Sequence, residues 1–446
     1  MLLPLPLTPS EPHASAGFVF WGDPQVGGTQ TCTLARKAMS YQIRELEVTR
    51  PLQSLALSER ETGAAFLLRR KGKPIAFWME ELPANHVLTP SDLARRISQE
   101  AREKLVCESL REELAVAPEP SRLPSLCVAV CTKDRPERLA RCLRSVRALK
   151  WDALGSAVRA ELLVVDNASS DERTRELVST FDDVRYVLEP KPGLNFARNR
   201  ALRATSCDLL AYLDDDVTVD SGWLQGLMEA WAENPDAAAF TGQVLPYALA
   251  TRAQVLFEQC GGFRRGFDKV RYGQARVDDE SYPCSSGIFG TGANMAFQRA
   301  TLEELGGFDE ALDTGAALPG GGDHDIFYRV VRAGYPLVYD PGYLVFHEHR
   351  REIEALRRQY GGSWGRGLMA FVAKSYAQDA PQRSKFRRLV VRWFLRRIRE
   401  LAKSFSAQEP LRPDMVAAEL WGGVVGLCGE YGRSLRRVER IRSEFA

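Results

Sequence analysis

With 446 residues, the chain is too long for one ordinary domain, and we expect two or three. The composition, 45% hydrophobic and 26% charged, is typical of a soluble globular protein. A formal net charge of +2 argues against a general nucleic-acid-binding protein. No apolar run reaches the roughly 18 residues of a membrane-spanning helix. Nine cysteines without a Cys-x-x-Cys pair predict buried thiols in a reducing, cytoplasmic compartment.

The N-terminal part predicts a tail followed by a small domain. Residues 1–40 begin with a proline-broken apolar stretch, which indicates a disordered Pro-rich tail. Residues 41–115 predict a small α+β domain with a strand-turn-strand unit around Gly72 and a helix capped by Thr89. The Pro-rich segment after it is a natural domain boundary.

Strands and helices alternate from residue 126 onward. This order predicts a parallel α/β sheet with helices on both faces, in which ligands bind at the carboxyl ends of the strands. The expected strands are residues 126–132, 161–167, 184–190 and 209–213, and the expected helices between them are residues 135–149, 171–181 and 193–205.

Three carboxylates, Asp214, Asp215 and Asp216, directly follow the last of these buried strands. Alternation along a strand places Asp214 and Asp216 on one face, where two unpaired carboxylates favour a divalent cation such as Mg²⁺. The alternative is a solvated acidic turn. Asp166 also ends a strand, either as part of the same site or as an ordinary turn residue.

The glycine-rich phosphate loops of other nucleotide-binding folds do not occur in this sequence. Neither G-x-G-x-x-G after the first strand nor G-x-x-x-x-G-K-[ST] is present. A bound phosphate would therefore need a metal ion or basic side chains.

Seven motifs, in this order and spacing, resemble an inverting glycosyltransferase of family 2 with the GT-A fold, over roughly residues 124–350. They are VAVCTKDRPERLARCLRSV, ELLVVDNASSD, PGLNFARNRAL, LAYLDDDV, GTGANMAFQR, GGFDE and GGGDHDIFYRVVRAGY. The resemblance implies that a sugar is transferred from a nucleotide-diphosphate sugar to the hydroxyl of an acceptor.

The resemblance also implies roles for individual residues. Asp214 and Asp216 match the D-x-D motif, which would hold Mg²⁺ or Mn²⁺, and His347 stands where some members have a further metal ligand. A structural histidine is the alternative for His347. The residues that would bind the nucleotide-sugar are Thr132, Arg135, Asp166, Arg198, Asp214, Asp215, Gly292, Ala293 and Asn294.

Asp323 matches the catalytic base of the family, although Gly322 replaces the glutamate that usually precedes it. A carboxylate on a glycine-rich loop can accept a proton from an acceptor hydroxyl. Asp323 as a helix N-cap is the alternative, and Asp325 and His324 are rival bases. We expect Asp325, in the first helical turn, to brace the loop.

The C-terminal region, residues 351–446, is predicted to be helical, with a break at Gly361-Gly362. Residues 383–403 hold nine Lys or Arg and one Glu, and apolar residues alternate with them at helical spacing. This pattern is typical of a helix on an anionic membrane surface, here residues 383–405 on the cytoplasmic face. A helix packed on the catalytic domain is the alternative.

The leading interpretation is a metal-dependent inverting glycosyltransferase acting in surface glycan, glycolipid or glycoside synthesis, with no nucleic-acid partner. A sugar nucleotidyltransferase is disfavoured because that class needs a glycine-rich loop after the first strand. A catalytically silent sugar- or lipid-binding scaffold is the non-enzymatic alternative, and the complete carboxylate set argues against it.

Overall fold

The computed structural model describes residues 39–114, 123–154, 159–273, 279–313, 315, 317–406 and 411–445. The expected Pro-rich tail lies outside the described residues up to residue 38. The same is true of residues 115–122 in the expected linker.

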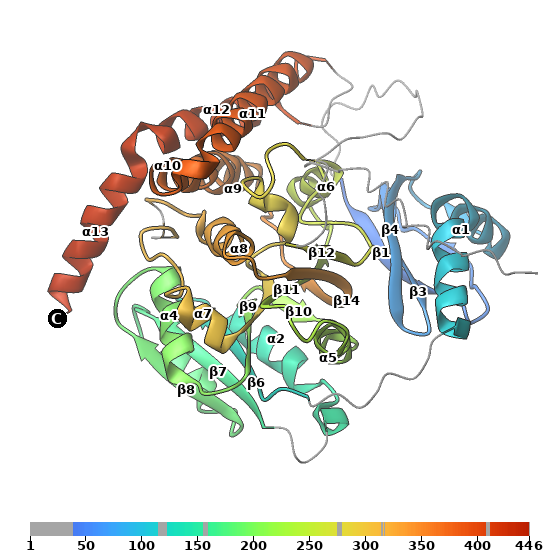
Figure 1. Ribbon diagram of the computed structural model, residues 1–446. Helices are drawn as coiled ribbons and strands as arrows, with labels where there is room; N and C mark the ends of the chain where they lie inside the picture. The colour runs from blue at the N-terminus through green and yellow to red at the C-terminus, as the bar shows by residue number, and fades with distance from the viewer. Residues whose placement is uncertain are drawn as a thin grey trace, which may run out of the picture.

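A nine-stranded mixed sheet forms the centre of the molecule (Figure 1). Its strand order is β10-β14-β11-β13-β9-β6-β7-β8, and β12 pairs with β14. The strands are β6 (Leu126–Thr132), β7 (Ala160–Asn167), β8 (Val184–Glu189), β9 (Leu209–Asp214), β10 (Val217–Val219), β11 (Ala239–Pro246), β12 (Val270–Tyr272), β13 (Asn294–Gln298) and β14 (Leu337–His347).

One half of this sheet is the parallel α/β unit predicted from the sequence. Strands β9, β6, β7 and β8 run parallel in this order. In the other half, whose strand directions the sequence did not predict, β13 runs antiparallel to both β9 and β11. Beyond β9 the alternation stops: only Asp215 and Asp216 separate β9 from β10, too few residues for the crossover that parallel neighbours need.

Helices cover both faces of the sheet, as expected. On one face, Leu139, Leu143 and Trp223 pack in a buried cluster, and on the other face Ala197 and Phe327 do so. The helices that cover the sheet are α2 (Pro136–Arg147), α3 (Arg173–Val178), α4 (Leu194–Ala204), α5 (Trp223–Glu233), α7 (Arg299–Glu304) and α8 (Gly322–Arg332), whereas α6 (Arg252–Gln259) packs against Leu356 and Tyr360 of the C-terminal region.

The N-terminal unit lies beside the central sheet, on the side opposite the C-terminal helices (Figure 1). As predicted, Thr89 caps α1, since its hydroxyl accepts the N–H of Asp92 at 3.2 Å. A buried ion pair of 2.5 Å between Arg69 and Asp220 joins the unit to the central domain. Its elements are β1 (Tyr41–Glu47), β2 (Leu55–Ala56), β3 (Gly63–Arg70), β4 (Lys73–Glu81), β5 (Val87–Leu88) and α1 (Pro90–Leu114).

The C-terminal region is helical, but the predicted break at Gly361-Gly362 is wrong. Tyr360–Gly367 instead forms a π-helical segment that continues from one helix into the next. The glycines here permit close packing, because a Cβ on Gly422 would lie 1.9 Å from the Gly361 carbonyl oxygen. The helices are α9 (Ile353–Gln359), α10 (Leu368–Gln378), α11 (Arg383–Lys403), α12 (Pro413–Val425) and α13 (Tyr431–Glu444).

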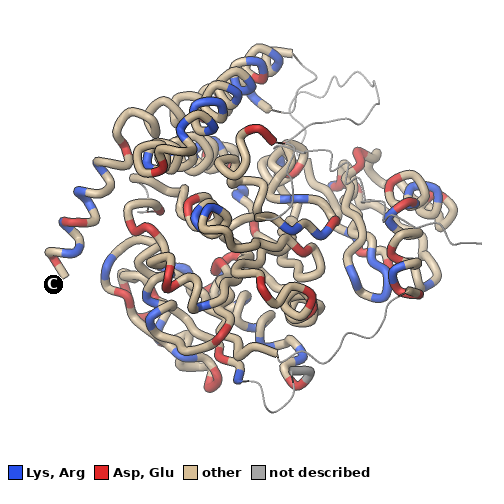
Figure 2. The backbone as a smooth tube through the Cα atoms, in the orientation of Figure 1, with Lys and Arg blue, Asp and Glu red and all other residues tan. Residues whose placement is uncertain are grey.

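Helix α11 packs on the central domain through part of its apolar surface. Phe386 is fully buried, and its ring centroid lies 5.3 Å from that of Tyr328 in α8. Basic residues line the same helix (Figure 2). A second apolar stripe stays exposed, with exposed fractions of 56% for Val391, 48% for Leu395 and 53% for Ile398. In the described part of the chain, no helix combines the length and apolar character needed to cross a membrane.

Candidate active site

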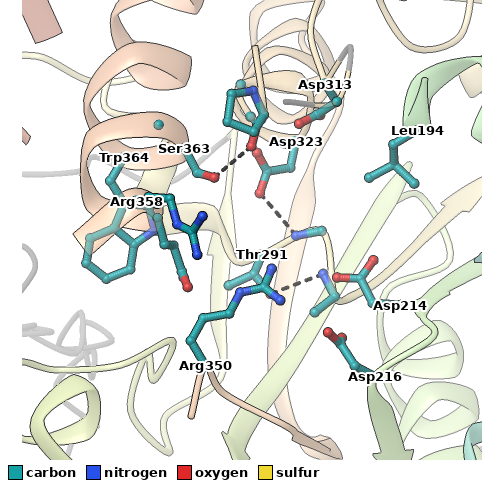
Figure 3. Close-up of a pocket in the computed structure, with 18 of the residues that line it drawn as sticks. Leu194, Asp214, Asp216, Thr291, Asp313, Asp323, Arg350, Arg358, Ser363 and Trp364 are labelled. Atoms are coloured by element: carbon teal, nitrogen blue, oxygen red, sulfur yellow. Dashed lines mark hydrogen bonds between the residues drawn. The ribbon is translucent and has the colours of Figure 1, made fainter. Parts of the chain in front are cut away.

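A cavity of about 1270 Å³ opens at the carboxyl ends of β6 and β9. Asp214 and Asp216 lie on one side of it, Asp323 lies above them, and Trp364 lies on the opposite side (Figure 3). The predicted residues that line the cavity are Thr132, Arg135, Arg198, Asp214, Asp215, Asp216, Gly292, Ala293, Asp323 and His347. These residues, far apart in the sequence, therefore meet in one place.

Three groups at this edge have the geometry of a metal site. One ligand atom from each of Asp214, Asp216 and His347 lies within 4.8 Å of the others. The imidazole Nε2 of His347 is 3.2 Å from the Oδ1 of Asp216. Asp214 ends β9, and His347 ends β14, so the central sheet itself sets this arrangement.

Asp215 points to a different set of partners, as the strand alternation predicts. Its carboxylate accepts a hydrogen bond from the Thr132 hydroxyl at 2.8 Å and another from Arg135 at 3.1 Å. Burial raises the pKa of Asp215 to about 6, with a further contribution from the neighbouring Asp216. Asp215 therefore connects the acidic triplet to Thr132, at the end of β6, and to Arg135.

The charges of the metal-site residues depend on each other. Burial opposes ionisation of Asp216, but His347 and Arg135 outweigh burial and lower its pKa. Burial likewise disfavours a charged His347, yet Asp216 and Asp214 overcome it and raise the pKa of His347. Burial raises the pKa of Asp214, against the attraction of Arg198. Without a cation, a protonated His347 balances the carboxylates.

A chain of hydrogen bonds runs from His347 through His349 to Glu258. It determines which ring nitrogen of a neutral His347 carries the proton. The Nε2 of His349 lies 2.7 Å from the carboxylate of Glu258, which can only accept, so His349 carries its proton on Nε2. Burial lowers the pKa of His349, which keeps it neutral, and its Nδ1 is therefore an acceptor. The Nδ1 of His347, 3.0 Å away, donates to it. The Nε2 of His347 can then offer a lone pair toward Asp216.

Arg198 is a buried cation in the wall of the cavity. It lies 3.8 Å from Asp214 and 3.6 Å from Asp313. A Cβ on Gly292 would lie 2.8 Å from the Nη2 of Arg198, so the glycine leaves room for the guanidinium in its present position. Burial raises the pKa of Asp313 to about 7, against the attraction of Arg198.

Asp323 lies in the first turn of α8, which begins at Gly322 with Gly321 as its cap. The alternative of Asp323 as the N-cap is therefore wrong. Its carboxylate accepts the N–H of Gly292 at 3.1 Å and that of His324 at 2.8 Å. Burial would raise the pKa of Asp323, but His324, Arg198 and these two donors outweigh it and lower the pKa. Asp323 is thus ionised at neutral pH.

Close packing explains why Gly322, rather than the usual glutamate of the family motif, precedes Asp323. The N–H of Gly322 donates to Asp313 at 2.9 Å, and a Cβ on Gly322 would lie 2.1 Å from the same carboxylate. No larger side chain fits at position 322 while Asp313 and Asn195 occupy this space.

The two rival bases have other partners. Asp325 is 1% exposed and accepts from Lys374 at 2.6 Å and from Arg329 at 2.8 Å. His324 lies 3.2 Å from the Ser286 hydroxyl, and burial lowers its pKa. Asp325 therefore joins α8 to α10, while His324 remains at the cavity wall.

Two predicted site residues lie outside the described lining of the cavity. Asp166 accepts from the Tyr186 hydroxyl at 2.8 Å and from the Ser169 hydroxyl. Asn294 is fully buried; its amide donates to two backbone carbonyls, and its oxygen accepts from Trp223 at 3.0 Å. In this structure Asn294 braces β13 against its neighbours.

Sequence reasoning missed several residues of the site. Asp313 and Arg350 line the cavity, and Glu258 and His349 support His347. A signal existed only for His349, because it lies two residues after His347 in FHEHR. Glu258 lies about 90 residues away in α6, and nothing in its surroundings in the sequence points to this site.

Comparison with known proteins identifies the central domain. Residues 127–305 match the model of the family described as Glycosyl transferase family 2. This region is a family 2 glycosyltransferase domain. Together with the sheet order, the match confirms the GT-A class of α/β fold expected from the sequence.

Named relatives share parts of this domain. The pre-mycofactocin glycosyltransferase of Mycobacterium tuberculosis is 26% identical over 254 residues, which cover 55% of this chain and 48% of that protein. The succinoglycan biosynthesis protein ExoM of Rhizobium meliloti is 31% identical over 201 residues, covering 44% and 62%. The chain thus matches from about half to three fifths of the length of these relatives.

The domain is also similar to a solved structure, the mannosyltransferase PcManGT from Pyrobaculum calidifontis in complex with GDP-Man and Mn²⁺. The TM-score is 0.42 at 19% sequence identity, and the match covers 75% of this chain and 82% of the other.

Proposed function

We propose that the protein is a metal-dependent, inverting glycosyltransferase that moves a sugar from a nucleotide-diphosphate sugar to an acceptor hydroxyl. The observation that carries the proposal is the meeting of Asp214, Asp216 and His347 in the same cavity as Asp323. Named relatives are glycosyltransferases, which supports the reaction class. Surface glycan, glycolipid or glycoside synthesis is the proposed setting.

The donor set fits Mg²⁺ or Mn²⁺. Two carboxylates and one neutral imidazole are ligands that Mn²⁺ accepts, and Mg²⁺ would use the carboxylates. The hydrogen-bond chain through His349 leaves the lone pair of His347 Nε2 on the side of Asp216. Bound there, the ion would neutralise charge that develops on a departing diphosphate.

The protein's own side chains supply the rest of the donor site. Arg198 and Arg350 line the same cavity as the metal site, and their charges suit a diphosphate. The proposed contacts of the nucleoside remain Thr132, Arg135, Asp166 and Asp215, at or just after the ends of β6, β7 and β9. Gly292 and Ala293 are proposed to line the sugar, because the loop before β13 separates the metal site from Asp323.

Asp323 is the proposed base. Its carboxylate is ionised at neutral pH and lies on the cavity wall, where it can take the proton of an acceptor hydroxyl as the oxygen attacks the sugar. Attack from the side opposite the diphosphate would invert the anomeric centre. A lowered pKa makes Asp323 a weak base, so proton transfer would occur late, once the new bond has begun to form.

A calorimetric titration of the full chain with UDP and with GDP tests donor binding, in Mn²⁺ and in EDTA. We expect binding of one nucleotide in Mn²⁺ only. Slow hydrolysis of the matching nucleotide-sugar, followed by proton NMR, would then reveal the anomer released first. A product of retained configuration would contradict inversion.

Residues 383–405 remain a proposed contact with an anionic membrane surface. The part of α11 available for it is the exposed stripe of Val391, Leu395 and Ile398, since Phe386 packs inward. Co-sedimentation with anionic liposomes should be salt-sensitive and lost when Arg387, Arg388, Arg392 and Arg396 are changed to Glu. Equal binding to neutral liposomes would contradict this proposal.

A further inference from the structure

A second cavity, of about 460 Å³, lies between α11 and the central domain. Its volume is within the range of pockets that hold small molecules. It shares two wall residues, His324 and Trp364, with the large cavity of the candidate active site. The two cavities therefore meet at His324, the residue that follows the proposed base Asp323 in the sequence.

The wall of the second cavity combines two kinds of side chain. Apolar groups come from the central domain and from α10 and α11: Ile288, Leu368, Leu389, Trp393 and Leu395. Four arginines of α11 also line it: Arg392, Arg396, Arg397 and Arg399. A ligand that fits both parts has an apolar chain and an anionic group.

Carboxylates pair with three of these four arginines. Arg392 pairs with Asp279 at 3.2 Å, and Arg396 pairs with Glu400 at 2.9 Å. Among the described lining residues, Glu419 is the one acid, and burial raises its pKa to about 7. Arg397 also pairs with Glu400 and lies 3.3 Å from Glu419. Four guanidinium groups thus lie beside three carboxyl groups, one of them partly protonated, and a net positive charge remains near neutral pH.

We propose that this cavity binds the apolar chain and the anionic group of an amphipathic acceptor, whose hydroxyl end reaches Asp323 past His324 and Trp364. The inference rests on the proposed function and names its acceptor class. The exposed stripe on α11 is continuous with the cavity, because Leu395 belongs to both. A long chain could therefore leave the cavity along this stripe.

The test uses alkyl phosphates as probes and isothermal titration of the full chain. Each buried methylene tightens binding roughly fourfold, so octyl phosphate should bind on the order of 10²-fold more tightly than butyl phosphate. Octyl glucoside, which has the same chain without the charge, should bind at least fivefold more weakly than octyl phosphate. Equal affinity for the two phosphates, or for octyl phosphate and octyl glucoside, would overturn the proposal.

Two matched variants distinguish the cavity from a general apolar surface. Leu395→Glu places a charge in the cavity mouth, whereas Val391→Glu places one a helical turn away, at a residue of similar exposure outside the cavity lining. We expect octyl phosphate binding to weaken at least tenfold in the first variant and less than twofold in the second. Equal weakening in both would indicate adsorption to the exposed stripe and would overturn the proposal.

A second pair of variants tests the anionic group. Arg399→Gln should weaken octyl phosphate binding at least threefold, and Arg387→Gln, on the same helix but outside the cavity lining, should not. Unchanged binding in both would overturn the charged part of the proposal. Mn²⁺-dependent nucleotide binding is measured on the same samples. If it persists while octyl phosphate fails to bind, only the acceptor inference is wrong, whereas loss of nucleotide binding in the unmodified chain contradicts the proposed function.

Discussion

The Nε2 of His349 lies 2.7 Å from the carboxylate of Glu258, and this contact determines what His347 can do at the metal site. It leaves His349 Nδ1 as an acceptor for the Nδ1–H of His347. The contact between His349 and Glu258, neither of which is a proposed metal ligand, thus directs the lone pair of His347 Nε2 toward Asp216. The family pattern names His347 but not the two residues behind it.

Replacing His349 with Phe should therefore weaken Mn²⁺ binding. The phenyl ring keeps the packing against Phe257 and Phe263 but cannot accept the proton of His347. Loss of such an outer contact typically costs 10–100-fold in metal affinity. Titration of Mn²⁺ in the presence of excess nucleotide measures it. His349→Gln, which retains an acceptor, should restore part of the affinity, and unchanged affinity in His349→Phe would contradict the assigned proton positions.

Mn²⁺ affinity should also rise with pH. The carboxylates of Asp216 and Asp214 raise the pKa of His347, so at lower pH the metal must displace a proton from Nε2. Affinity should increase by up to about tenfold per pH unit below that pKa and level off above it. His347→Gln should lose most of this dependence. A flat profile between pH 5.5 and 8 in the unmodified chain would argue against His347 as a ligand.

Changing Asp323 to Asn should leave metal-dependent nucleotide binding intact and lower turnover by about 10²-fold or more, because the base is lost. Asp325→Asn should instead reduce thermal stability, since Lys374 and Arg329 would lose a buried partner. Turnover of donor with the accepted alcohol measures the first effect. Near-normal turnover in Asp323→Asn with an inactive His324→Ala would transfer the role of base to His324.

Glu419 predicts a pH dependence of stability. Burial raises its pKa to about 7 in the folded state, against an ordinary value of 4.5, with Arg397 opposing the shift. The folded state therefore keeps this proton between about pH 4.5 and 7 while the unfolded state releases it. As the pH rises from about 4.5 to 7, the free energy of unfolding should therefore fall by up to roughly 3 kcal/mol. In Glu419→Gln the melting temperature should change less between pH 5 and 7.5. If the melting temperature of Glu419→Gln changed between pH 5 and 7.5 as much as that of the unmodified chain, the raised pKa would not belong to Glu419.

The parallel half of the sheet was predictable because its signals are local. Buried runs such as Leu126–Thr132 and Leu209–Asp214 alternate with amphipathic helices, and strand alternation separates Asp215 from its two neighbours. The predicted helix after Asp166 proved shorter than expected, since α3 spans only Arg173–Val178.

The remaining features depend on contacts between distant segments. Helix periodicity recognised the apolar residues of α11, but it could not tell that Phe386 packs on Tyr328 while Val391 stays exposed. Asp313 lies in a loop without a strand-end pattern, and only folding brings it beside Arg198 and Gly322. Glycines at 361 and 422 look like helix breakers, whereas here they allow two helices to touch.

The most direct test of the central claim is a titration of UDP and GDP into the unmodified chain and into Asp216→Asn, each with Mn²⁺ and with EDTA. The account predicts that one nucleotide binds the unmodified chain in Mn²⁺, and that its affinity falls at least tenfold in EDTA and in the variant. Equal affinity under all four conditions would contradict a metal-dependent donor site at Asp214, Asp216 and His347.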